Sequence, residues 1–213
     1  MNSAIIVAGG TSTRFGGEIP KQFVTLKGRE ILSFSVNTFS SHPDIDEVVI
    51  VCHTEWIEHV QEKYPRCKVV EGGKTRQDSS LAGIKAVQPG TTAVLIHDAA
   101  RPLVTESIIS NCLNALIDGD GSAPILDASS SLINLENDQA SFVDRNTIKE
   151  VQTPQCFKTN LIMDALHSGL MGTDEIGIVL QYSPQSKLNF VAGDARNFKV
   201  TTEFDLKLLT AIT

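Results

Sequence analysis

Short apolar runs alternate along the chain with longer stretches in which apolar residues recur every three or four positions. The short runs are bounded by turn residues, which is typical of buried β-strands. The longer stretches have the spacing of amphipathic helices. The predicted strands cover residues 4–7, 48–52, 68–70, 93–96, 123–126 and 189–192, and the predicted helices cover residues 31–40, 56–63, 77–87, 107–116, 159–168 and 202–212.

This alternation predicts an α/β fold with a Rossmann-like, mostly parallel sheet flanked by helices. Several of the strands are apolar on both faces, as expected for strands covered by helices on each side. Ligands of such folds bind beyond the carboxyl ends of the strands, so the loops that follow strands are the places to search for chemistry. The length of 213 residues favours one domain, 1–213.

Residues 127–150 do not follow the alternation of strands and helices. Two short segments of high β-propensity, 132–135 and 141–143, flank a polar turn at 136–139. The pattern predicts a β-hairpin arm that projects from the body of the protein. Because an isolated hairpin is only marginally stable in water, we expect the arm to pack on a second subunit.

Composition narrows the classes of partner. The net charge of −7 and the pI near 5.2 exclude sequence-independent binding to nucleic acid, which needs a basic surface. No apolar run approaches the roughly 18 residues of a membrane span. The four cysteines are scattered without metal-ligand or disulfide spacing, which predicts reduced thiols and a cytoplasmic location. They are Cys52, Cys67, Cys112 and Cys156.

The loop after the first predicted strand combines small residues with two cations. Ala8, Gly9 and Gly10 allow backbone N–H groups to approach phosphate oxygens, and Arg14 and Lys21 can neutralise charge that moves when a bond to phosphorus breaks. The spacing fits neither a Walker A loop nor a dinucleotide fingerprint. A flexible loop with two solvated cations is the alternative interpretation.

Two further loops follow strands. Gly73 and Ser79 lie where a helix begins, and free N–H groups and hydroxyls there can hold polar ligand edges, although a simple helix cap is the alternative. Asp98 ends a buried strand, where a carboxylate is suited to Mg²⁺ beside phosphates; its alternative is a turn cap or an ion pair with Arg101. His97 is expected to be structural.

Four later residues are further candidates, and two of them, Arg145 and Thr153, could bind a second anion. Arg145 follows the arm and could hold a phosphate monoester, unless it only pairs with Asp144. Thr153 lies in a polar bend, and Thr173 precedes a helix start that is also a plausible capping sequence. Lys199 follows the last predicted strand, where a solvated lysine is the alternative.

Taken in order, these motifs resemble one family over nearly the whole chain, the cytidylyltransferases that activate methylerythritol 4-phosphate in isoprenoid biosynthesis. A sister family that activates pentitol phosphates such as ribitol 5-phosphate shares the nucleotide site. The motifs are Ala8-Gly9-Gly10 with Arg14 and Pro20-Lys21-Gln22, Gly72-Gly73 with Arg76 and Ser79, His97-Asp98-Ala99-Ala100-Arg101-Pro102, Asp144-Arg145, Thr153-Pro154-Gln155, Thr173-Asp174-Glu175, and Asn197-Phe198-Lys199-Val200-Thr201.

The resemblance implies a role for each matched residue. It implies that CTP is contacted by Ala8, Gly9, Gly10, Gly73 and Ser79. It further implies that Arg14, Lys21 and Lys199 surround the triphosphate, that Asp98 positions Mg²⁺, that Arg145, Thr153 and Thr173 hold the sugar phosphate, and that the catalytic set is Arg14, Lys21, Arg145 and Lys199. Arg101 would have a supporting role. The arm would be exchanged between two subunits, which would bring Arg145 or Thr153 to the partner's active site.

Two departures from the family pattern bear on these expectations. Ser12 stands where the loop usually has a second glycine, so binding there is expected to be retuned. Residues 127–131 lack the Thr and Lys often found after that Asp in methylerythritol phosphate enzymes, which leaves ribitol 5-phosphate open as acceptor.

The expected reaction is direct displacement at the α-phosphorus of CTP by an acceptor phosphate oxygen. Because the attacking group is already an anion, the cations and Mg²⁺ matter more than a general base. Two rival hypotheses are a noncatalytic CTP-binding module whose arm recruits a partner and a sugar-1-phosphate nucleotidyltransferase that uses another base.

Overall fold

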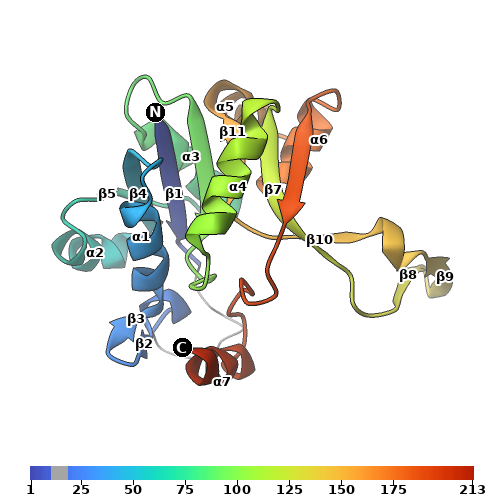
Figure 1. Cartoon of the computed structure of the whole chain (residues 1–213), viewed down its shortest axis with the longest axis horizontal. Helices are drawn as coiled ribbons and strands as arrows, with labels where there is room; N and C mark the ends of the chain where they lie inside the picture. The colour runs from blue at the N-terminus through green and yellow to red at the C-terminus, as the bar shows by residue number, and fades with distance from the viewer. Residues whose placement is uncertain (11–18) are drawn as a thin grey trace.

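The computed structural model describes residues 1–10 and 19–213. Its described part is built on an eight-stranded sheet in the order β10-β7-β11-β6-β1-β4-β5, with β12 beside β7 (Figure 1). Within this sheet of the described residues, only β10 and β11 run antiparallel to their neighbours. The strands are β1 (Asn2–Ala8), β4 (Glu47–Cys52), β5 (Lys68–Glu71), β6 (Ala93–Asp98), β7 (Gly121–Asp127), β10 (Lys149–Val151), β11 (Gln155–Lys158) and β12 (Leu188–Ala192).

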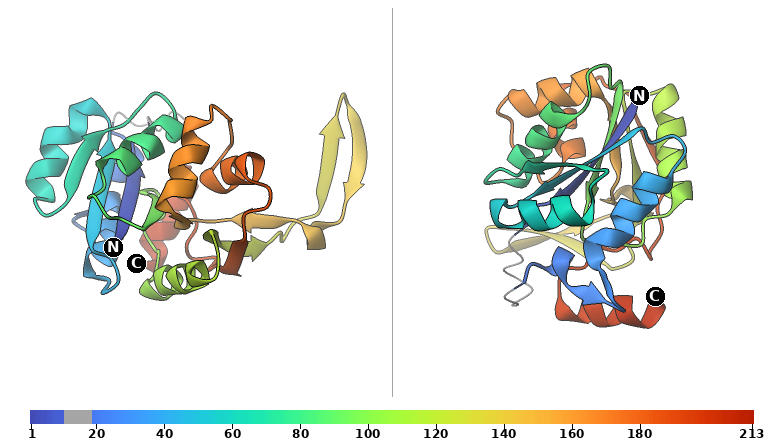
Figure 2. Two further views of the ribbon diagram at one scale, coloured as in Figure 1. Left: turned by 90° about the horizontal axis from the view of Figure 1, so that it is seen from above. Right: turned by 90° about the vertical axis from the view of Figure 1, so that its left-hand side faces the viewer.

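Helices cover both faces of this sheet (Figure 2). Side chains alternate between the faces of a strand, so Ile6 of β1 packs in the same cluster as Leu32 of α1, while Ile5 packs in the cluster that contains Ile84 of α3. The predicted mostly parallel, helix-flanked fold is confirmed. The helices are α1 (Ile31–Ser41), α2 (Ile57–Lys63), α3 (Arg76–Ala86), α4 (Glu106–Ile117), α5 (Thr159–His167), α6 (Glu175–Tyr182) and α7 (Glu203–Ile212).

Several elements were not predicted as such from the sequence. Strand β11 has only four residues, yet it pairs with both β6 and β7 and completes the sheet between them. Helix α6 was recognised only by its start, and Asp174 indeed caps it by accepting a hydrogen bond from the Gly177 N–H at 2.9 Å. Both elements are too short for hydrophobic periodicity to define.

The predicted hairpin arm is present. It consists of β8 (Leu132–Glu136) and β9 (Gln139–Val143), joined by Asn137 and Asp138 with φ of 49° and 61°. Two positive φ values at such a turn match the right-handed twist of the strands. The arm extends away from the body (Figures 1 and 2), and its base is a ladder between β7 and β10 in which Lys149 pairs with Asp127.

Helix α7 packs beside the start of α1. Leu209 of α7 packs with Val200, Ile31 and Leu26, so the segment that carries Lys199 is fixed against the start of α1. Three small elements lie beside the start of α1: η1 (Lys21–Phe23), β2 (Thr25–Leu26) and β3 (Arg29–Glu30). Two more short helices lie elsewhere, η2 (Thr54–Trp56) before α2 and η3 (Arg145–Thr147) on the arm. None of the helices in residues 1–10 and 19–213 has the length and apolar character needed to cross a membrane.

Candidate active site

Two adjoining cavities open at the carboxyl end of the parallel strands. The first has a volume of about 320 Å³ and the second about 170 Å³, and they share Arg76, Asp98 and Lys199 as lining residues. The first is lined by Ala8, Gly9, Gly10, Lys21, Gly73, Ser79, Asp98 and Lys199, all proposed from the sequence, together with Val7, Gln22, Lys74, Thr75, Arg76, Ala99, Ala100 and Thr201. The second is lined by Thr153 and Thr173, also proposed, with Arg76, Asp98, Arg101, Val151, Gln155, Asp174 and Lys199.

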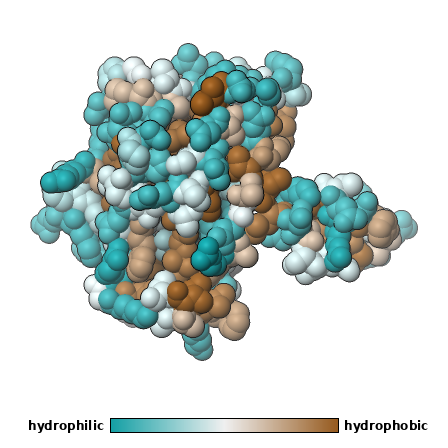
Figure 3. Space-filling model, viewed as in Figure 1, coloured by the Kyte–Doolittle hydropathy of each residue, from teal (hydrophilic) through white to brown (hydrophobic). Residues whose placement is uncertain are grey.

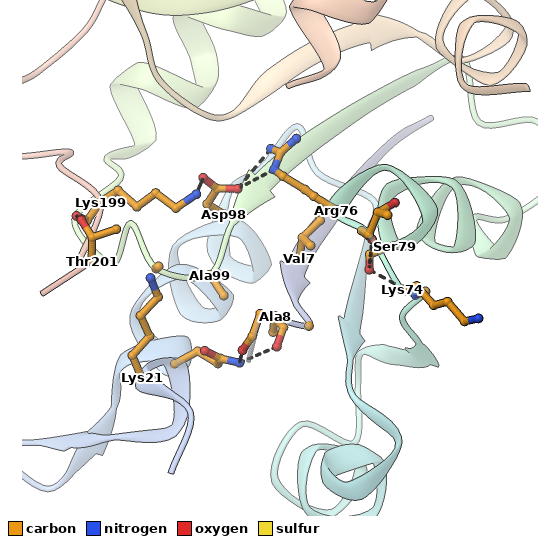
Figure 4. Close-up of a pocket in the computed structure, with 16 residues that line it drawn as sticks. Val7, Ala8, Lys21, Lys74, Arg76, Ser79, Asp98, Ala99, Lys199 and Thr201 are labelled. Carbon is orange, nitrogen blue, oxygen red and sulfur yellow. Dashed lines mark hydrogen bonds and ion pairs between the residues drawn. The ribbon is translucent and has the colours of Figure 1, made fainter. Parts of the chain in front are cut away.

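Asp98 lies at the junction of the two cavities, between cations. Its Oδ1 accepts hydrogen bonds from Nε and Nη2 of Arg76 at 3.2 and 3.1 Å, and its Oδ2 lies 2.8 Å from Nζ of Lys199 (Figure 4). Arg101 Nε lies 3.8 Å from the same Oδ2. Burial alone would raise the pKa of this carboxyl, but Arg76, Lys199 and Arg101 outweigh burial and hold it well below its usual range. Asp98 is therefore ionised at neutral pH.

Arg76 is fixed from both sides. Besides Asp98, its guanidinium binds the fully buried carboxylate of Glu175, which also accepts a hydrogen bond from Ser80 Oγ at 2.6 Å. Burial opposes the charge of Arg76, but the two carboxylates raise its pKa above the usual value. Arg76 thus brings a permanent positive charge to the wall between the two cavities.

Arg76 and Glu175 belong to the matched sequence motifs, but the sequence analysis assigned no role to either residue. The signal for Arg76 was its position directly after a strand and a glycine-containing loop, where Lys21 and Lys199 were noticed for the same reason. Glu175 was taken only as part of a helix cap, because its pairing depends on the first turn of α6 lying beside that of α3.

The loop before α3 is shaped by Gly73 and Ser79. Ser79 Oγ accepts a hydrogen bond from the Gly73 N–H at 3.2 Å and donates to the Thr75 carbonyl at 2.9 Å. A Cβ atom at Gly73 would lie 2.1 Å from Cβ of Asp78, so only glycine fits this close approach. Thr75 and Asp78 form a reciprocal capping box that begins α3.

Gln22 was missed as a contributor to the first cavity. Its buried side-chain amide donates to the carbonyl of Ala8 at 2.6 Å and to that of Gly10 at 3.1 Å. The amide therefore holds the end of β1 and the beginning of the following loop in a fixed shape. The adjacent Lys21 points toward Ala99 at the cavity, whereas Lys74 points away from Asp98 (Figure 4).

Thr153 lies in a buried network behind the second cavity. Its Oγ1 accepts a hydrogen bond from the Asp98 N–H at 3.1 Å and lies 3.0 Å from Nδ1 of His97. His97 is completely buried, and burial lowers the pKa of its imidazole to about 4. The imidazole is neutral at physiological pH, consistent with the structural role expected for it.

One proposed residue, Arg145, is not brought to either cavity by this chain alone. Arg145 is in η3 on the arm, where its Nη1 donates to the Ser129 carbonyl at 3.1 Å. It lines neither cavity. Arg14 and Ser12 lie outside the described residues.

Comparisons with known proteins agree with this architecture. The family model described as 2-C-methyl-D-erythritol 4-phosphate cytidylyltransferase matches residues 2–213. The chain belongs to this family. It is therefore a nucleotidyltransferase, and the predicted activity class is confirmed.

Individual relatives support the assignment over nearly the full chain. The 2-C-methyl-D-erythritol 4-phosphate cytidylyltransferase of Clostridium botulinum (strain 657 / Type Ba4) is 38% identical, with 97% of this chain and 95% of the relative aligned. The crystal structure of 4-diphosphocytidyl-2C-methyl-D-erythritol synthase from Anaerococcus prevotii superposes with a TM-score of 0.87 at 27% identity, covering 99% of this chain and 94% of that one.

The name of one relative specifies a different acceptor, a ribitol compound. The bifunctional ribulose 5-phosphate reductase/CDP-ribitol pyrophosphorylase Bcs1 of Haemophilus influenzae is 34% identical over 96% of this chain and 46% of its own length. Family membership and the relatives named 2-C-methyl-D-erythritol 4-phosphate cytidylyltransferase favour methylerythritol phosphate chemistry for this chain.

Proposed function

We propose that this enzyme transfers the cytidylyl group of CTP to the phosphate of 2-C-methyl-D-erythritol 4-phosphate and releases pyrophosphate. The observation that carries the proposal is the pair of cavities that meet at Asp98, Arg76 and Lys199. A reaction between two polyanions needs two neighbouring sites with cations at their boundary, because the reacting groups otherwise repel each other. This arrangement supplies both.

CTP is assigned to the first cavity. The backbone of Ala8, Gly9 and Gly10 and the Gly73–Ser79 loop offer small, polar edges for the base and ribose, while Lys21 and Lys199 face the space for the triphosphate. Arg14 belongs to the same proposal on the strength of the sequence. These residues would stabilise charge on the departing pyrophosphate.

The acceptor is assigned to the second cavity, with its phosphate toward the shared cations. A phosphate oxygen of the acceptor attacks the α-phosphorus of CTP, and a new phosphorus–oxygen bond forms. The bond from the α-phosphorus to the oxygen that bridges to the β-phosphorus breaks, and pyrophosphate leaves with that electron pair. Thr153 and Thr173 line the cavity on the acceptor's side. No covalent enzyme intermediate is required.

Mg²⁺ is the proposed metal, with Asp98 as its protein ligand. Among the described residues, no three or more His, Cys, Asp or Glu side chains converge as a ready-made metal cluster. Mg²⁺ is commonly held by one or two carboxylates plus substrate phosphates, so the single carboxylate at the junction of the cavities fits it. When bound, the ion would add positive charge beside the phosphate oxygens. Its binding would compete with the contacts of Asp98 to Arg76 and Lys199.

We further propose a homodimer in which the arm carries Arg145 to the second cavity of the partner. The arm exposes Ile133, Leu135 and Phe142 at 67%, 63% and 87%, which is costly for a hairpin that stays in water. Apolar residues show on the arm and where it leaves the body (Figure 3). The cytoplasmic location stays a prediction from the sequence.

Ribitol 5-phosphate is the second candidate acceptor. It is favoured by the relative from Haemophilus influenzae and by the residues that follow Asp127, which depart from the methylerythritol pattern. A pyrophosphate-release assay with CTP and each acceptor in parallel separates the two. We expect stoichiometric release with methylerythritol phosphate.

The same assay tests the rival classes. CTP binding without pyrophosphate release for any polyol phosphate would establish a noncatalytic module and overturn the proposal. A panel of the four nucleoside triphosphates completes the test, because higher turnover with another base would point to a sugar-1-phosphate nucleotidyltransferase instead.

A further inference from the structure

Thr153 lines the second cavity, and the direction of its hydroxyl group is fixed by a buried network. Thr153 Oγ1 receives the backbone N–H of Asp98 at 3.1 Å. A hydroxyl group has one proton and two lone pairs, so this bond uses one lone pair and leaves the proton and one lone pair to be placed. His97 Nδ1, 3.0 Å away, decides where the proton goes.

The other nitrogen of His97 determines its tautomer. Nε2 lies 3.1 Å from the carbonyl oxygen of Arg101, which can only accept a hydrogen bond. Ser35 Oγ also lies 3.4 Å from Nε2, but it donates its proton to the same Arg101 carbonyl. Nε2 therefore carries the proton of the neutral ring, and Nδ1 is left bare as an acceptor. Thr153 consequently donates its hydroxyl proton to His97, away from the cavity.

The ring is held firmly in this orientation. It has no exposed surface, and its centroid lies 5.0 Å from that of Phe39. Ser35 Oγ donates to the same Arg101 carbonyl at 3.2 Å. Rotation of the imidazole would leave the buried Thr153 proton without an acceptor.

We propose that His97 is a positioning residue that makes Thr153 a hydrogen-bond acceptor in the second cavity. Thr153 then binds an O–H group on the chain of the polyol phosphate rather than an oxygen of its phosphate. The cavity already offers Arg76, Arg101 and Lys199 to the phosphate. A phosphate oxygen has no proton to give to a lone pair, whereas a polyol hydroxyl has one. The inference rests on the proposed assignment of the acceptor to this cavity.

Two substitutions of His97 separate its two ring nitrogens. His97→Gln retains an N–H donor near the position of Nε2 and removes the acceptor for Thr153. His97→Asn retains an oxygen near the position of Nδ1 and removes the donor to Arg101. We expect His97→Gln to raise KM for the polyol phosphate about 10-fold, the equivalent of one hydrogen bond, with KM for CTP unchanged. His97→Asn should restore most of the KM for the polyol phosphate.

The direction in which KM for the polyol phosphate changes in His97→Gln shows whether Thr153 accepts a hydrogen bond from the substrate or donates one to it. If Thr153 donates to the acceptor's phosphate, freeing its proton in His97→Gln would lower KM for the polyol phosphate or leave it unchanged, and the inference would be wrong. It would also be wrong if the Gln and Asn variants had equal effects, or if KM for CTP rose in parallel. Ser35→Ala is the matched control, because the Ser35 hydroxyl lies on the Nε2 side of the ring, 3.4 Å from Nε2 and 3.2 Å from the Arg101 carbonyl, and does not contact Thr153. Because Nε2 keeps its bond to Arg101, both KM values should stay near wild type.

A double-mutant cycle tests whether His97 acts through Thr153. We expect Thr153→Val to raise KM for the polyol phosphate, and adding His97→Gln to it should cause no further rise. Additive effects would contradict the proposal. Absence of pyrophosphate release by the wild-type enzyme with every polyol phosphate would instead refute the proposed function, so the two failures are distinguishable.

A spectroscopic measurement on wild-type protein covers the case in which the variants do not fold. A long-range ¹H–¹⁵N NMR spectrum identifies which nitrogen of His97 carries the proton. We expect protonation at Nε2 alone. A proton at Nδ1 would overturn the inference, because Nδ1 would then donate to Thr153.

Discussion

Nζ of Lys199 lies 2.8 Å from Oδ2 of Asp98, so a cation proposed for the triphosphate is held by the carboxylate proposed for Mg²⁺. The two proposed roles compete for the same pair of groups. If Asp98 held a metal ion, Lys199 would be free to face the phosphates in the first cavity. The ion pair thus keeps both groups in place before the substrate arrives.

Asp98→Asn tests this competition. Removing the negative charge should raise the Mg²⁺ concentration that gives half-maximal turnover, since the metal loses a charged ligand. It should also tighten metal-free CTP binding about 10-fold, because Lys199 and Arg76 are no longer neutralised. Turnover at various Mg²⁺ concentrations and calorimetric CTP titration in a chelator measure the two effects.

Asp120→Asn is the control for Asp98→Asn, since Asp120 pairs with Lys158 on the exposed surface away from both cavities. Asp120→Asn should change neither the Mg²⁺ concentration that gives half-maximal turnover nor the affinity for CTP without metal. An unchanged Mg²⁺ requirement in Asp98→Asn would remove Asp98 as the metal ligand.

Lys21→Ala removes a preorganised charge from the first cavity. Its turnover should fall roughly 10²-fold to 10³-fold at saturating substrates, the usual effect of losing one such group, while the fold survives. Steady-state kinetics and circular dichroism provide the measurement. Lys85→Ala removes the same charge from the exposed face of α3 and should keep wild-type turnover. Nearly full turnover of Lys21→Ala would show that Lys21 has no catalytic role.

Gln22→Leu keeps the size of the side chain but removes the amide that holds the Ala8 and Gly10 carbonyls. We expect KM for CTP to rise about 10-fold, because the loop loses its fixed shape and two carbonyls lose a donor. KM for the polyol phosphate should change little. Gln181→Leu is a matched control, since that amide also donates to two carbonyls but lies on α6. Equal effects of both variants on CTP would contradict this assignment.

The sequence was informative where function depends on position relative to a strand end. Lys21, Asp98 and Lys199 follow predicted strands, and the structure places all three on the first cavity. The hairpin arm was also predictable, because its two segments are separated by a short polar turn. What could not be predicted is pairing between distant segments. Glu175 binds Arg76 across 99 positions, and no local pattern reveals such a contact.

The same limit applies to the interior of the sheet. The contact of Thr153 with His97 spans 56 positions and depends on β11 lying beside β6. A threonine before Pro154 is compatible with several roles until its neighbours are known. The sequence therefore pointed to Thr153 as a site residue without giving the direction of its hydrogen bonds.

His97 predicts how stability depends on pH. Its folded pKa of about 4 lies below the ordinary value of 6.5, so between these values the unfolded chain binds more protons than the folded one. The contribution of neutral His97 to the free energy of unfolding is fully present above about pH 6.5 and decreases as the pH falls toward 4. The free energy of unfolding should be about 2 kcal/mol lower at pH 5 than at pH 7.

Urea unfolding at the two pH values measures this difference. His97→Gln cannot be protonated and should lose most of it. The contribution of Asp98 is lost only at lower pH, because its folded pKa is depressed and it stays ionised throughout this range. If His97→Gln kept the full difference in the free energy of unfolding, the pH dependence would arise from another group.

The position of Arg145 on the arm makes subunit exchange directly testable. Arg145 lines neither cavity of its own chain, so a role in catalysis requires it to reach a partner's site. Arg145→Ala and Lys21→Ala would then damage different halves of one composite site. In a mixed dimer of the two variants, one site carries both substitutions and the other carries neither.

Coexpression of the two variants with different affinity tags allows the mixed dimer to be isolated. Each parent dimer should be nearly inactive, whereas the mixed dimer should recover about half of wild-type turnover, because one of its two sites is intact. If Arg145 acts within its own chain, each site of the mixed dimer carries one substitution and no activity returns. The arm's apolar residues give an independent check: Phe142→Ser should shift the protein toward monomer in sedimentation and lower turnover with it, since an exposed side chain contributes nothing to a monomer's stability.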